Sequence, residues 1–521
     1  MKKFARLLAL VLACLMVATM LIACKDDPPP EDPFVYDDGG FVADDLPDDL
    51  KYNGEVIRVL HWEPTKPEFN TQGGADPVQQ AVALRKTNIE DRLDVELDYT
   101  SQVGGNNAGH RDFLAYVKNI QESSAGYDSK FDLIAAYSRT AGSLATAGYF
   151  IDLKSLSADE SYLNLEKPWW PKSIEETLDI GGKLMMVSGD ASTNLLYQMQ
   201  MVFFNKRMMQ EYYGAEAEAA GFASATDWMY NKVSQGTWTI DEMIRLTEGL
   251  WSDGNGTESG TASQDDYFGI CATYYHVDSF YTGSGLKLIE KDAAKTLVIS
   301  NDYGSQTTTD LVAKLGEWLS RKDAWTAGTD VSEQERLDNH TPFNEGRALF
   351  LPVRAQHIEN TTMRENFKPG ILPVPKYDTT QSEYYTAIGN AFTLYGITKS
   401  SLQRTEMGRT EASKMMTAVL ECWGSEGYRR TTPQIYDNNF TGKLVENDTE
   451  AQMFDIIRSG IVIDLGRILG YELVVTSGQY PMSELPSQSI CNNEAWSVNY
   501  NRYYSGMSDR LAELVGDIVW G

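Results

Sequence analysis

The chain has 521 residues, of which 42% are hydrophobic, and its formal net charge at pH 7 is −29. This length is greater than one hydrophobic core usually serves, so we expect at least two lobes. The acidic balance argues against nucleic acid or an anionic membrane surface as a binding partner, because both attract clustered lysine and arginine.

The first residues have the anatomy of a lipoprotein signal peptide. Three basic residues lie within the first six positions, an apolar run follows, and the run closes at Ala23 and Cys24. A small residue followed by cysteine is the pattern at which such signal peptides are cleaved. We therefore expect residues 1–23 to be removed and Cys24 to carry acyl chains such as palmitate. The protein would then be anchored at the outer face of the cell membrane.

The alternative interpretation, a membrane-spanning helix, is opposed by the residues that follow Cys24. Residues 25–30 are charged and proline-rich, which prevents the helix from continuing. The whole segment 24–50 is acidic and rich in aspartate and proline, and it is predicted to be an extended tether. No later segment has the uninterrupted apolar length of a membrane span, so we expect the rest of the chain to be a soluble extracytoplasmic body.

Strand-like and helical segments alternate in the first part of this body. Strands are predicted at residues 56–60, 95–99 and 131–136, and helices at 76–92 and 111–122. Asp76 and Pro77 supply the N-cap and the first residue of the first helix. The order βαβαβ predicts a parallel sheet with helices on its faces.

The rest of the chain continues this mixture of helices and short strands. Strands are predicted at residues 183–188, 268–272 and 348–353, helices after Thr239 and at 411–422, and a helical region from about 450 with a loop near 481–486. Thr239 and Glu242 form a capping box at the start of their helix. Residues 370–375 contain two prolines and are predicted to be an extended crossing between lobes, with a hinge there.

Several segments, in their order along the chain, carry a resemblance to a known family. They are Phe131-Asp132-Leu133-Ile134 and residues 148–153, 182–187, 202–206, 237–242, 343–350, 425–427, 433–436, 453–455 and 464–466. Each motif is weak alone. Together with the Cys24 signal, their order resembles that of the family 1 extracellular solute-binding proteins, lipoprotein receptors that pass ligands, commonly sugars and oligosaccharides, to ABC importers.

The resemblance implies an α/β, two-lobed, periplasmic-binding-protein-like fold of type II. Each lobe would be a mostly parallel sheet flanked by helices, and multiple hinge crossings would join the lobes. Projected onto this chain, lobe 1 comprises residues 51–192 plus 373–425 and lobe 2 comprises 193–372 plus 426–521. Closure of such lobes around a ligand takes its energy from contacts made only in the closed state.

The function that the resemblance implies is binding without chemistry. A monomer would capture a solute between its two lobes, with a sugar or oligosaccharide as the expected ligand, and would deliver it to the permease subunits of an ABC importer. We therefore expect no catalytic residue. We also expect no cofactor other than a structural calcium ion.

A surface-tethered glycoside hydrolase is the alternative function. Hydrolysis of a glycosidic bond needs two carboxylates about 5 to 9.5 Å apart. With 74 aspartate and glutamate residues, the sequence neither locates nor excludes such a pair. The absence of a GxSxG motif or a phosphate-binding loop counts mildly against an enzyme.

The candidate ligand-binding residues follow from the predicted strand ends and from what a sugar needs. Ligands gather at the carboxyl ends of parallel strands, and a sugar cleft needs aromatic rings beside carboxylates, amides and guanidinium groups. On these grounds we expect contacts from Trp62, Glu63, Tyr137, Ser138, Arg139, Asp190, Tyr274, Tyr275, Arg354, Asn390 and Trp423. Asn390 is included because the resemblance implies a ligand contact there.

Several of these candidates also have a purely structural interpretation. For the two tryptophans it is packing against a helix, and for Tyr274 and Tyr275 it is an aromatic pair in the core. For Arg354 it is half of a structural ion pair. For Asp190 and Asn390 it is a turn. The sequence leaves both interpretations open.

A calcium loop is the one metal site that the sequence suggests. Alternate oxygen-bearing side chains begin at residue 253, as they do in calcium loops, and the candidate ligands are Asp253, Asn255, Thr257 and Asp266. The segment departs from the EF-hand pattern at Glu258 and Gln264, so a solvated polar hairpin is the alternative. The five histidines lie scattered along the chain, and no CxxC or HExxH spacing is present.

Overall fold

The computed structural model describes residues 34–64, 66–69, 71, 73–74, 76–105, 107–124, 126–171, 174–256, 262–327, 339–404, 407–441 and 447–520. The predicted signal peptide and Cys24 lie outside these residues. The chain divides into a short unit that ends at Ala43 and a large unit that begins at Asp44. Within the described residues, no helix combines the length and apolar character that a membrane crossing needs.

The segment predicted as a tether is described only from residue 34. In the short unit, Tyr36 and Val42 form an antiparallel bridge. From Asp44 the chain belongs to the large unit, where Leu46 is buried and Asp45 forms an ion pair with Lys167 at 2.7 Å. The last residues of the predicted tether are therefore packed rather than extended, because Leu46 offers an apolar side chain to bury.

The first sheet of the large unit has the strand order β14-β3-β1-β2. These strands are β1 (Glu55–Trp62), β2 (Val95–Gln102), β3 (Leu133–Tyr137) and β14 (Thr393–Ile397). β1 pairs in parallel with β2 and β3, whereas β14 pairs antiparallel with β3. The predicted parallel βαβαβ sheet is confirmed. Its buried apolar residues, such as Ile57 and Val59, fix the face of each strand that meets the core.

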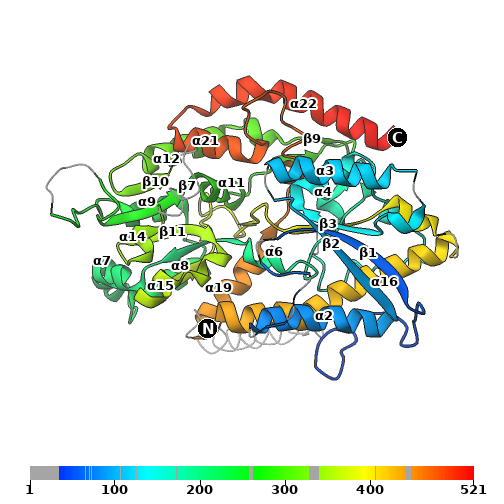
Figure 1. The fold of residues 1–521 in the computed structure, drawn as a ribbon. Coiled ribbons are helices and arrows are strands. Elements are labelled where there is room, and N and C mark those ends of the chain that lie inside the picture. Colours follow the sequence, from blue (N-terminus) through cyan, green and yellow to red (C-terminus); the bar gives the residue numbers. More distant parts are fainter. Residues whose placement is uncertain are drawn as a thin grey trace, which may run out of the picture. The chain divides into compact units, whose positions relative to one another are not determined.

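Helices cover both faces of the first sheet, as Figure 1 shows. α2 (Pro77–Leu93) and α16 (Arg409–Glu426) lie together on one face, and α3 (Asn107–Gln121) and α4 (Ser138–Thr146) lie on the other. Asp76 caps α2 as predicted, because its side chain accepts a hydrogen bond from the backbone N–H of Gln79. Asp94 is the C-cap residue that follows α2, and it adopts the left-handed conformation with φ of 50°.

The second sheet has the strand order β10-β7-β11-β6-β12. These strands are β6 (Gln200–Phe204), β7 (Phe268–Thr273), β10 (Ala324–Ala327), β11 (Ala348–Arg354) and β12 (Gly370–Leu372). β7 is parallel to β10 and β11, and β6 is antiparallel to β11 and β12. Only β6 therefore runs against the other four strands, so this sheet is mostly parallel, as predicted.

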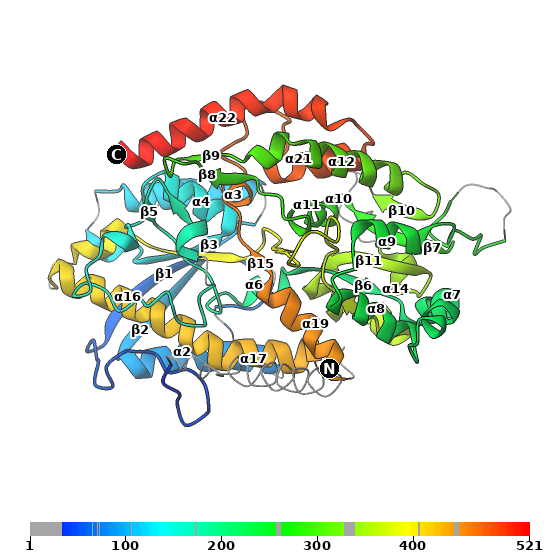
Figure 2. The same cartoon turned by 180° about the vertical axis from the view of Figure 1, so that it is seen from behind.

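Helices also pack on the second sheet. They include α7 (Lys206–Ala219), α8 (Ala225–Ser234), α9 (Ile240–Thr247), α12 (Gln306–Leu319), α14 (Thr341–Asn344) and α15 (Thr361–Asn366). α7 and α8 lie on one side of the sheet and α12 on the other (Figure 2). Half of the predicted capping box of α9 forms: Thr239 accepts from the N–H of Glu242, but the Glu242 carboxylate pairs with Lys232 and Arg245 instead of turning back.

The C-terminal region is helical, with α19 (Asp448–Ser459), α20 (Leu465–Ile468), α21 (Leu485–Cys491) and α22 (Trp496–Trp520). The loop predicted near residues 481–486 is wrong, because residues 482–484 form a 3-10 turn and α21 begins at Leu485. Pro486 is compatible with this helix because it lies in the first turn, where its missing N–H costs no intrahelical hydrogen bond. α22 packs against α12 and α21 and also against α4 (Figure 2).

The remaining elements are short and lie between these. They are α5 (Ile174–Thr177), β4 (Asp179–Ile180), β5 (Lys183–Leu184), α6 (Thr193–Tyr197), α10 (Tyr274–Val277), α11 (Ser279–Gly283), β8 (Ile289–Lys291), β9 (Leu297–Ile299), β13 (Thr386–Ala387), α17 (Thr432–Gln434) and β15 (Ile461–Val462). Two π-helical segments, Gly427–Thr431 and Ile435–Thr441, flank α17.

The chain passes between the two sheets in neighbouring segments. Val187 pairs with Tyr395 of β14, and twelve residues later Met199 pairs with Ile388, just before β6 begins. The return passage runs from the end of β12 at Leu372 to β14. Residues 370–372 of the predicted crossing are therefore a strand of the second sheet, and the crossing begins at Pro373. All strands of the first sheet fall within the range predicted for lobe 1, and all strands of the second within lobe 2.

Candidate functional site

A cavity of about 1030 Å³ lies at the carboxyl ends of strands from both sheets, and we call it the inter-sheet cavity. Its walls come from the end of β3, from α10 directly after β7, from the end of β11 and from the segment between residues 471 and 484. Six of the predicted ligand-binding residues line it: Tyr137, Arg139, Tyr274, Tyr275, Arg354 and Asn390. Residues that were predicted because they follow strands, and that are distant in the sequence, therefore lie together in this cavity.

Tyr137 and Arg139 form the wall contributed by the first sheet. Arg139 is 4% exposed, and its guanidinium donates to the Glu484 carboxylate at 2.6 Å and lies 5.0 Å from the ring of Tyr471. Burial opposes the charge of Arg139, but Glu484 outweighs burial and raises the pKa of the guanidinium. The positive charge of Arg139 is therefore already balanced within the protein.

Tyrosine rings dominate the wall contributed by the second sheet. Tyr274 and Tyr275 follow β7, and their ring centroids are 5.5 Å apart at an angle of 90°. The ring of Tyr480 meets Tyr274 edge-on at 6.4 Å. With Tyr137 and Tyr471, these residues give the cavity five tyrosines, each of which offers an apolar ring face and a polar hydroxyl.

Arg354 ends β11 and projects its guanidinium over the ring of Tyr275, with the carbon Cζ 5.1 Å from the ring centroid. Its Nε–H is buried without a hydrogen-bond partner. Among the described residues, no carboxylate forms an ion pair with Arg354. The other arginine of the cavity, Arg139, is paired with Glu484. Gly389 makes room for this side chain, because a Cβ at that position would lie 2.6 Å from Nε.

Three of the five histidines, which are scattered along the sequence, come together in the lining of the inter-sheet cavity. The ring of His340 lies 5.3 Å from that of His276 and 5.0 Å from that of His357. Burial lowers the pKa of His340 to about 4 and lowers the pKa values of His276 and His357 well below the usual range. These shifts favour the neutral form of each ring at pH 7.

The histidine cluster does not have the arrangement of a metal site. The rings of His276 and His340 stack at an interplanar angle of 20°, which does not direct their nitrogens to one common point. No group of histidine, cysteine, aspartate and glutamate suited to a metal ion occurs in the described part of the chain. Neither nitrogen of His340 has a hydrogen-bond partner, although the residue is only 2% exposed.

A buried ion pair lies behind the cavity wall. Arg467 donates to the Asp278 carboxylate at 2.7 Å and approaches the side-chain oxygen of Asn390 at 3.5 Å. Burial raises the pKa of Asp278, and Arg467 opposes this rise. Ser138 is fully buried and donates through its hydroxyl to the carbonyl of Asn390 at 2.7 Å. Ser138 therefore positions Asn390 and does not itself line the cavity.

The two predicted tryptophans are buried and do not line the inter-sheet cavity. The indole N–H of Trp62 donates to the hydroxyl of Thr393 at 2.8 Å, and its ring lies 5.4 Å from that of Tyr137. Trp423 on α16 packs against Tyr395 at 5.6 Å. Trp62 thus supports a cavity residue from behind, whereas Trp423 belongs to the core of the first sheet.

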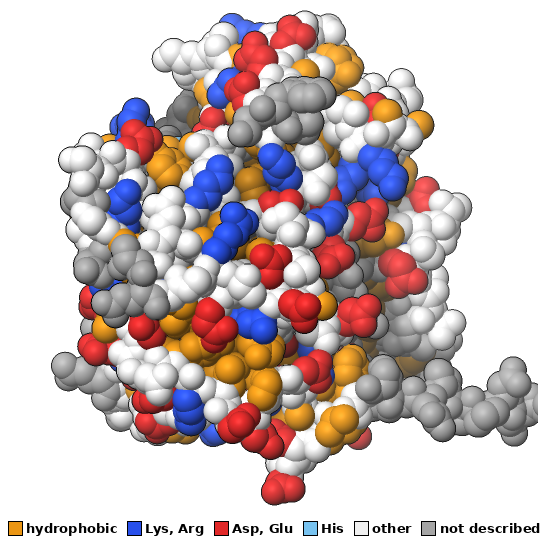
Figure 3. Space-filling model, turned by 90° about the vertical axis from the view of Figure 1, so that its right-hand side faces the viewer, with side chains coloured by type: hydrophobic (Ala, Val, Ile, Leu, Met, Phe, Trp, Pro, Cys, Tyr) orange, Lys and Arg blue, Asp and Glu red, His pale blue; other side chains and the backbone are white. Residues whose placement is uncertain are grey.

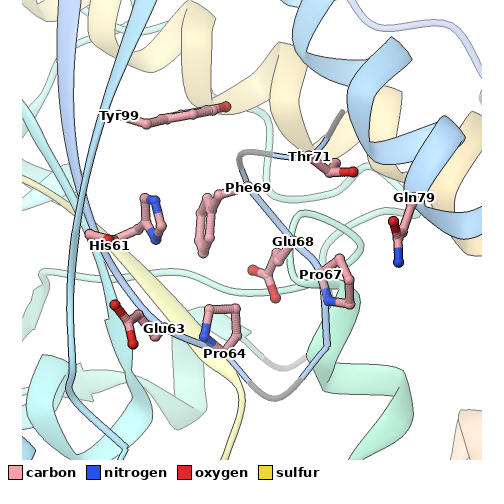
Figure 4. Close-up of a pocket in the computed structure, with 10 residues that line it drawn as sticks. His61, Glu63, Pro64, Pro67, Glu68, Phe69, Thr71, Gln79 and Tyr99 are labelled. Carbon is pink, nitrogen blue, oxygen red and sulfur yellow. The ribbon is translucent and has the colours of Figure 1, made fainter. Parts of the chain in front are cut away.

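Glu63 lines a different cavity, of about 590 Å³, at the ends of β1 and β2. Figure 4 shows the rings of His61 and Phe69 face to face there, and Glu63, an exposed residue, beside Pro64. The two ring centroids are 4.3 Å apart. Burial lowers the pKa of His61.

Asp190 lines a third cavity, of about 620 Å³, with Trp169, Trp170 and Tyr428. Its carboxylate accepts from Thr432 at 2.9 Å and pairs with Arg458 at 3.3 Å. Burial raises the pKa of Asp190, and Arg458 and Thr432 oppose that rise. The three cavities therefore divide the predicted residues among separate places.

The two aspartates among the described candidates for calcium binding accept from backbone N–H groups, and the side-chain amide of Asn255 donates to the Ser263 hydroxyl at 3.1 Å. Asp253 accepts from the N–H groups of Asn255 and Gly256, at 3.0 and 2.8 Å, and Asp266 accepts from those of Gly254 and Ser263. This is the pattern of a polar hairpin. Thr257 lies outside the described residues.

Several cavity residues were not predicted from the sequence. Gln356, His357, His340, Tyr471, Tyr480 and Glu484 all line the inter-sheet cavity. Gln356 and His357 lie two and three residues after Arg354, so extending the prediction three residues beyond the end of this strand would have included them. Tyr471, Tyr480 and Glu484 belong to no strand end, and no sequence signal points to them.

Solved structures of two sugar-binding proteins are similar to this chain. One is a cyclo/maltodextrin-binding protein in complex with maltotetraose, with a TM-score of 0.51 and 11% identity over 88% of this chain and 99% of that chain. The other is the galacto-N-biose/lacto-N-biose I-binding protein of an ABC transporter from Bifidobacterium longum, in complex with lacto-N-biose. It has a TM-score of 0.50 and 11% identity over 89% of this chain and 98% of that chain.

No family model matches the chain, and no curated protein matches it in sequence. The structural similarity nevertheless extends over nearly the whole length of both solved proteins. The chain therefore has the two-lobed, periplasmic-binding-protein-like α/β fold that its sequence predicts.

Proposed function

We propose that the protein is an extracytoplasmic solute-binding protein that captures a saccharide in the inter-sheet cavity and delivers it to an ABC importer. The observation that carries this proposal is the composition of the cavity: five tyrosines stand beside guanidinium, amide and imidazole groups at the carboxyl ends of strands from both sheets. Aromatic faces bind the C–H faces of sugar rings, and the polar groups exchange hydrogen bonds with hydroxyls.

The size of the cavity favours a ligand of more than one sugar ring. Its volume of about 1030 Å³ is at the upper end of the range of roughly 300–1,000 Å³ typical of small-molecule sites. Similarity in fold to proteins whose structures hold maltotetraose and lacto-N-biose agrees with such a ligand.

The hydrolase alternative has no support from this cavity. A glycosidase needs two carboxylates across the scissile bond, whereas Glu484 is the one carboxylate among the cavity-lining residues in the described part of the chain. That carboxylate already accepts a hydrogen bond from Arg139 at 2.6 Å.

The remaining parts of the proposal concern assembly and location. Cys24 would carry the lipid anchor, and permease subunits of the importer would receive the ligand from a monomeric receptor. Residues 51–192 plus 373–425 would move as lobe 1 and residues 193–372 plus 426–521 as lobe 2. The adjacent passages between the sheets, at residues 188–199 and 373–392, supply the hinge. The packing of α22 on both α12 and α4 makes this helix a further link between the lobes.

The proposal is tested by adding saccharides to the purified protein while tryptophan emission and glycan integrity are followed in one tube. The expected result is a saturable change in emission with no cleavage product. Cleavage of the glycan would contradict a receptor function. An emission change with amino acids or peptides, but with no saccharide, would contradict the assignment of ligand class.

A further inference from the structure

The balance of charge in the inter-sheet cavity leaves one cation without a partner. Two arginines and one glutamate line the cavity in the described part of the chain. Glu484 balances Arg139 at 2.6 Å, and the Asp278–Arg467 pair behind the wall balances itself at 2.7 Å. Asp278 feels the charge of Arg354, but Arg467 holds its carboxylate directly. Arg354 therefore contributes a net positive charge.

Arg354 is half-buried at the cavity wall, and no carboxylate among the described residues forms an ion pair with it. The Tyr275 ring covers one side of the guanidinium, and Gly389 packs against its Nε, which is buried without an acceptor. A charged group in such a place costs free energy unless an opposite charge and hydrogen-bond acceptors compensate it. In a chain with a net charge of −29, an unpaired cation at this position is conspicuous. It suggests that the compensating anion belongs to the ligand.

The histidine cluster adds donors to the same region and no negative charge. A neutral imidazole has one nitrogen that donates and one that accepts, and neither nitrogen of His340 has a partner although the residue lines the cavity. His276 and His357 already use one nitrogen each, toward Thr273 and Asn344. An oxygen-rich ligand would satisfy His340, whereas an apolar ligand would leave it unpaired.

We propose that the ligand is an acidic saccharide whose oxyanion binds the guanidinium of Arg354 and whose neighbouring oxygens reach His340. This inference rests on the proposed function and narrows its substrate class. The planar fork of an arginine matches the two oxygens of a carboxylate, as in a uronic acid, and also the oxygens of a sulfate ester. The shared chemistry is a sugar-borne oxyanion.

Two matched pairs of probes separate the anion from the sugar ring. Trigalacturonate is compared with its methyl ester, and galactose 6-sulfate with galactose, by titration calorimetry of the full chain. At least one anionic probe is expected to bind about tenfold or more tightly than its neutral match, and its Kd is expected to rise with NaCl concentration. Which pair responds distinguishes a carboxylate from a sulfate as the recognised group.

Arg354→Gln is expected to remove the preference for the anionic probe, and Arg354→Lys to retain part of it. Arg245→Gln is the matched control, because Arg245 is an exposed arginine that pairs with Glu216 and Glu242 on the surface. Circular dichroism of each variant checks folding, and the lysine variant keeps the test valid if the glutamine variant does not fold.

Three results would overturn the inference. Neutral and anionic probes could bind equally well, the preference could survive in Arg354→Gln, or neither anionic probe could bind. If a neutral saccharide still binds in any of these cases, the proposed receptor function stands and only the acidic class is wrong. If no saccharide of a broader panel binds, the proposed function fails with it.

Discussion

Tyr275 is the residue whose removal tests the cavity walls most simply. Its ring stands at a right angle to that of Tyr274 and lies below the guanidinium of Arg354. We predict that Tyr275→Ala weakens saccharide binding by about 1–2 kcal/mol, because an aromatic platform is lost. Titration calorimetry measures the effect. Tyr212→Ala is the matched control, since Tyr212 is 43% exposed on α7, and equal losses in both variants would contradict the role of Tyr275.

Trp62 has a different role from that of the tyrosines, because it is 1% exposed and does not line the cavity. Trp62→Ala would leave a void beside Gly105, which lies against the indole ring. We predict a loss of about 3–5 kcal/mol in the free energy of unfolding, measured by urea denaturation. A variant as stable as the natural chain, with weakened ligand binding, would show instead that the indole meets the ligand.

The residues of the cavity could be predicted only where a local rule applied. Tyr137, Tyr275 and Arg354 follow buried strands, so their position at the ligand-binding edge is encoded nearby in the sequence. Glu484 and Tyr471 come from a segment without a strand, and they reach the cavity only through the packing of α20 and α21. Whether an arginine is paired also depends on such distant segments, so the contrast between Arg139 and Arg354 was not predictable.

At the scale of elements, the start of α7 illustrates how a single side chain holds a helix on a sheet. Asn205 follows β6, and its side-chain oxygen accepts from the N–H groups of Arg207 and Met208. Its amide also donates to the carbonyl of Gly346 at 3.1 Å. We predict that Asn205→Ala lowers the free energy of unfolding by about 1–2 kcal/mol.

Thermal or urea unfolding checks this prediction against a control in the same helix. Glu211→Ala changes an exposed residue of α7 and is expected to alter stability by less than about 0.5 kcal/mol. If both substitutions had the same small effect, the cap of α7 would not contribute as proposed.

Helices and strands with local signals were the best predicted elements. Asp76 and Pro77 mark the start of α2, and the apolar segments near Ile57 and Leu133 mark β1 and β3. The start of α21 was missed because Pro486 reads as a loop residue, although a proline is equally compatible with a first helical turn. Local sequence does not distinguish these two settings of proline.

At the scale of the whole molecule, buried titratable groups make stability depend on pH. Burial lowers the pKa of His110 and of His340 to about 4, below the value of about 6.5 in an unfolded chain. Between these values the unfolded chain binds protons that the folded protein does not, so stability falls as the pH drops from about 6.5 toward 4.

We predict that His340→Gln reduces this acid sensitivity. One group with this shift accounts for a loss of about 2 kcal/mol between pH 7 and pH 5. Urea denaturation of both proteins at the two pH values measures the difference. An identical pH dependence in the variant would mean that His340 is protonated or solvated in the folded protein.

Glu421 on α16 makes the stability of the protein fall as the pH rises. Burial raises the pKa of its carboxyl to about 8, while the indole N–H of Trp170 and the backbone N–H of Asn164 oppose that rise. The folded protein therefore holds a proton that the unfolded chain has lost above pH 4.5. We predict that stability falls by about 2 kcal/mol from pH 6 to pH 8 and that Glu421→Gln removes most of this fall. A steep fall in the variant would contradict the prediction.

Acidic and basic side chains are interspersed on the face of the molecule in Figure 3, and no broad basic field appears there. Composition predicts the overall charge well, because net charge is the sum of the charges of the residues. The position of the ligand site cannot be obtained by adding up residue properties, because it depends on which strand ends of two separate sheets face the same cavity.

The most direct test of capture between the sheets is a crystal structure of the protein with the saccharide that binds it most tightly. The account predicts electron density for an intact saccharide against Tyr274 and Tyr275, within hydrogen-bonding distance of Arg354. Density for the ligand at the His61 or Trp169 cavities, with an empty inter-sheet cavity, would contradict it.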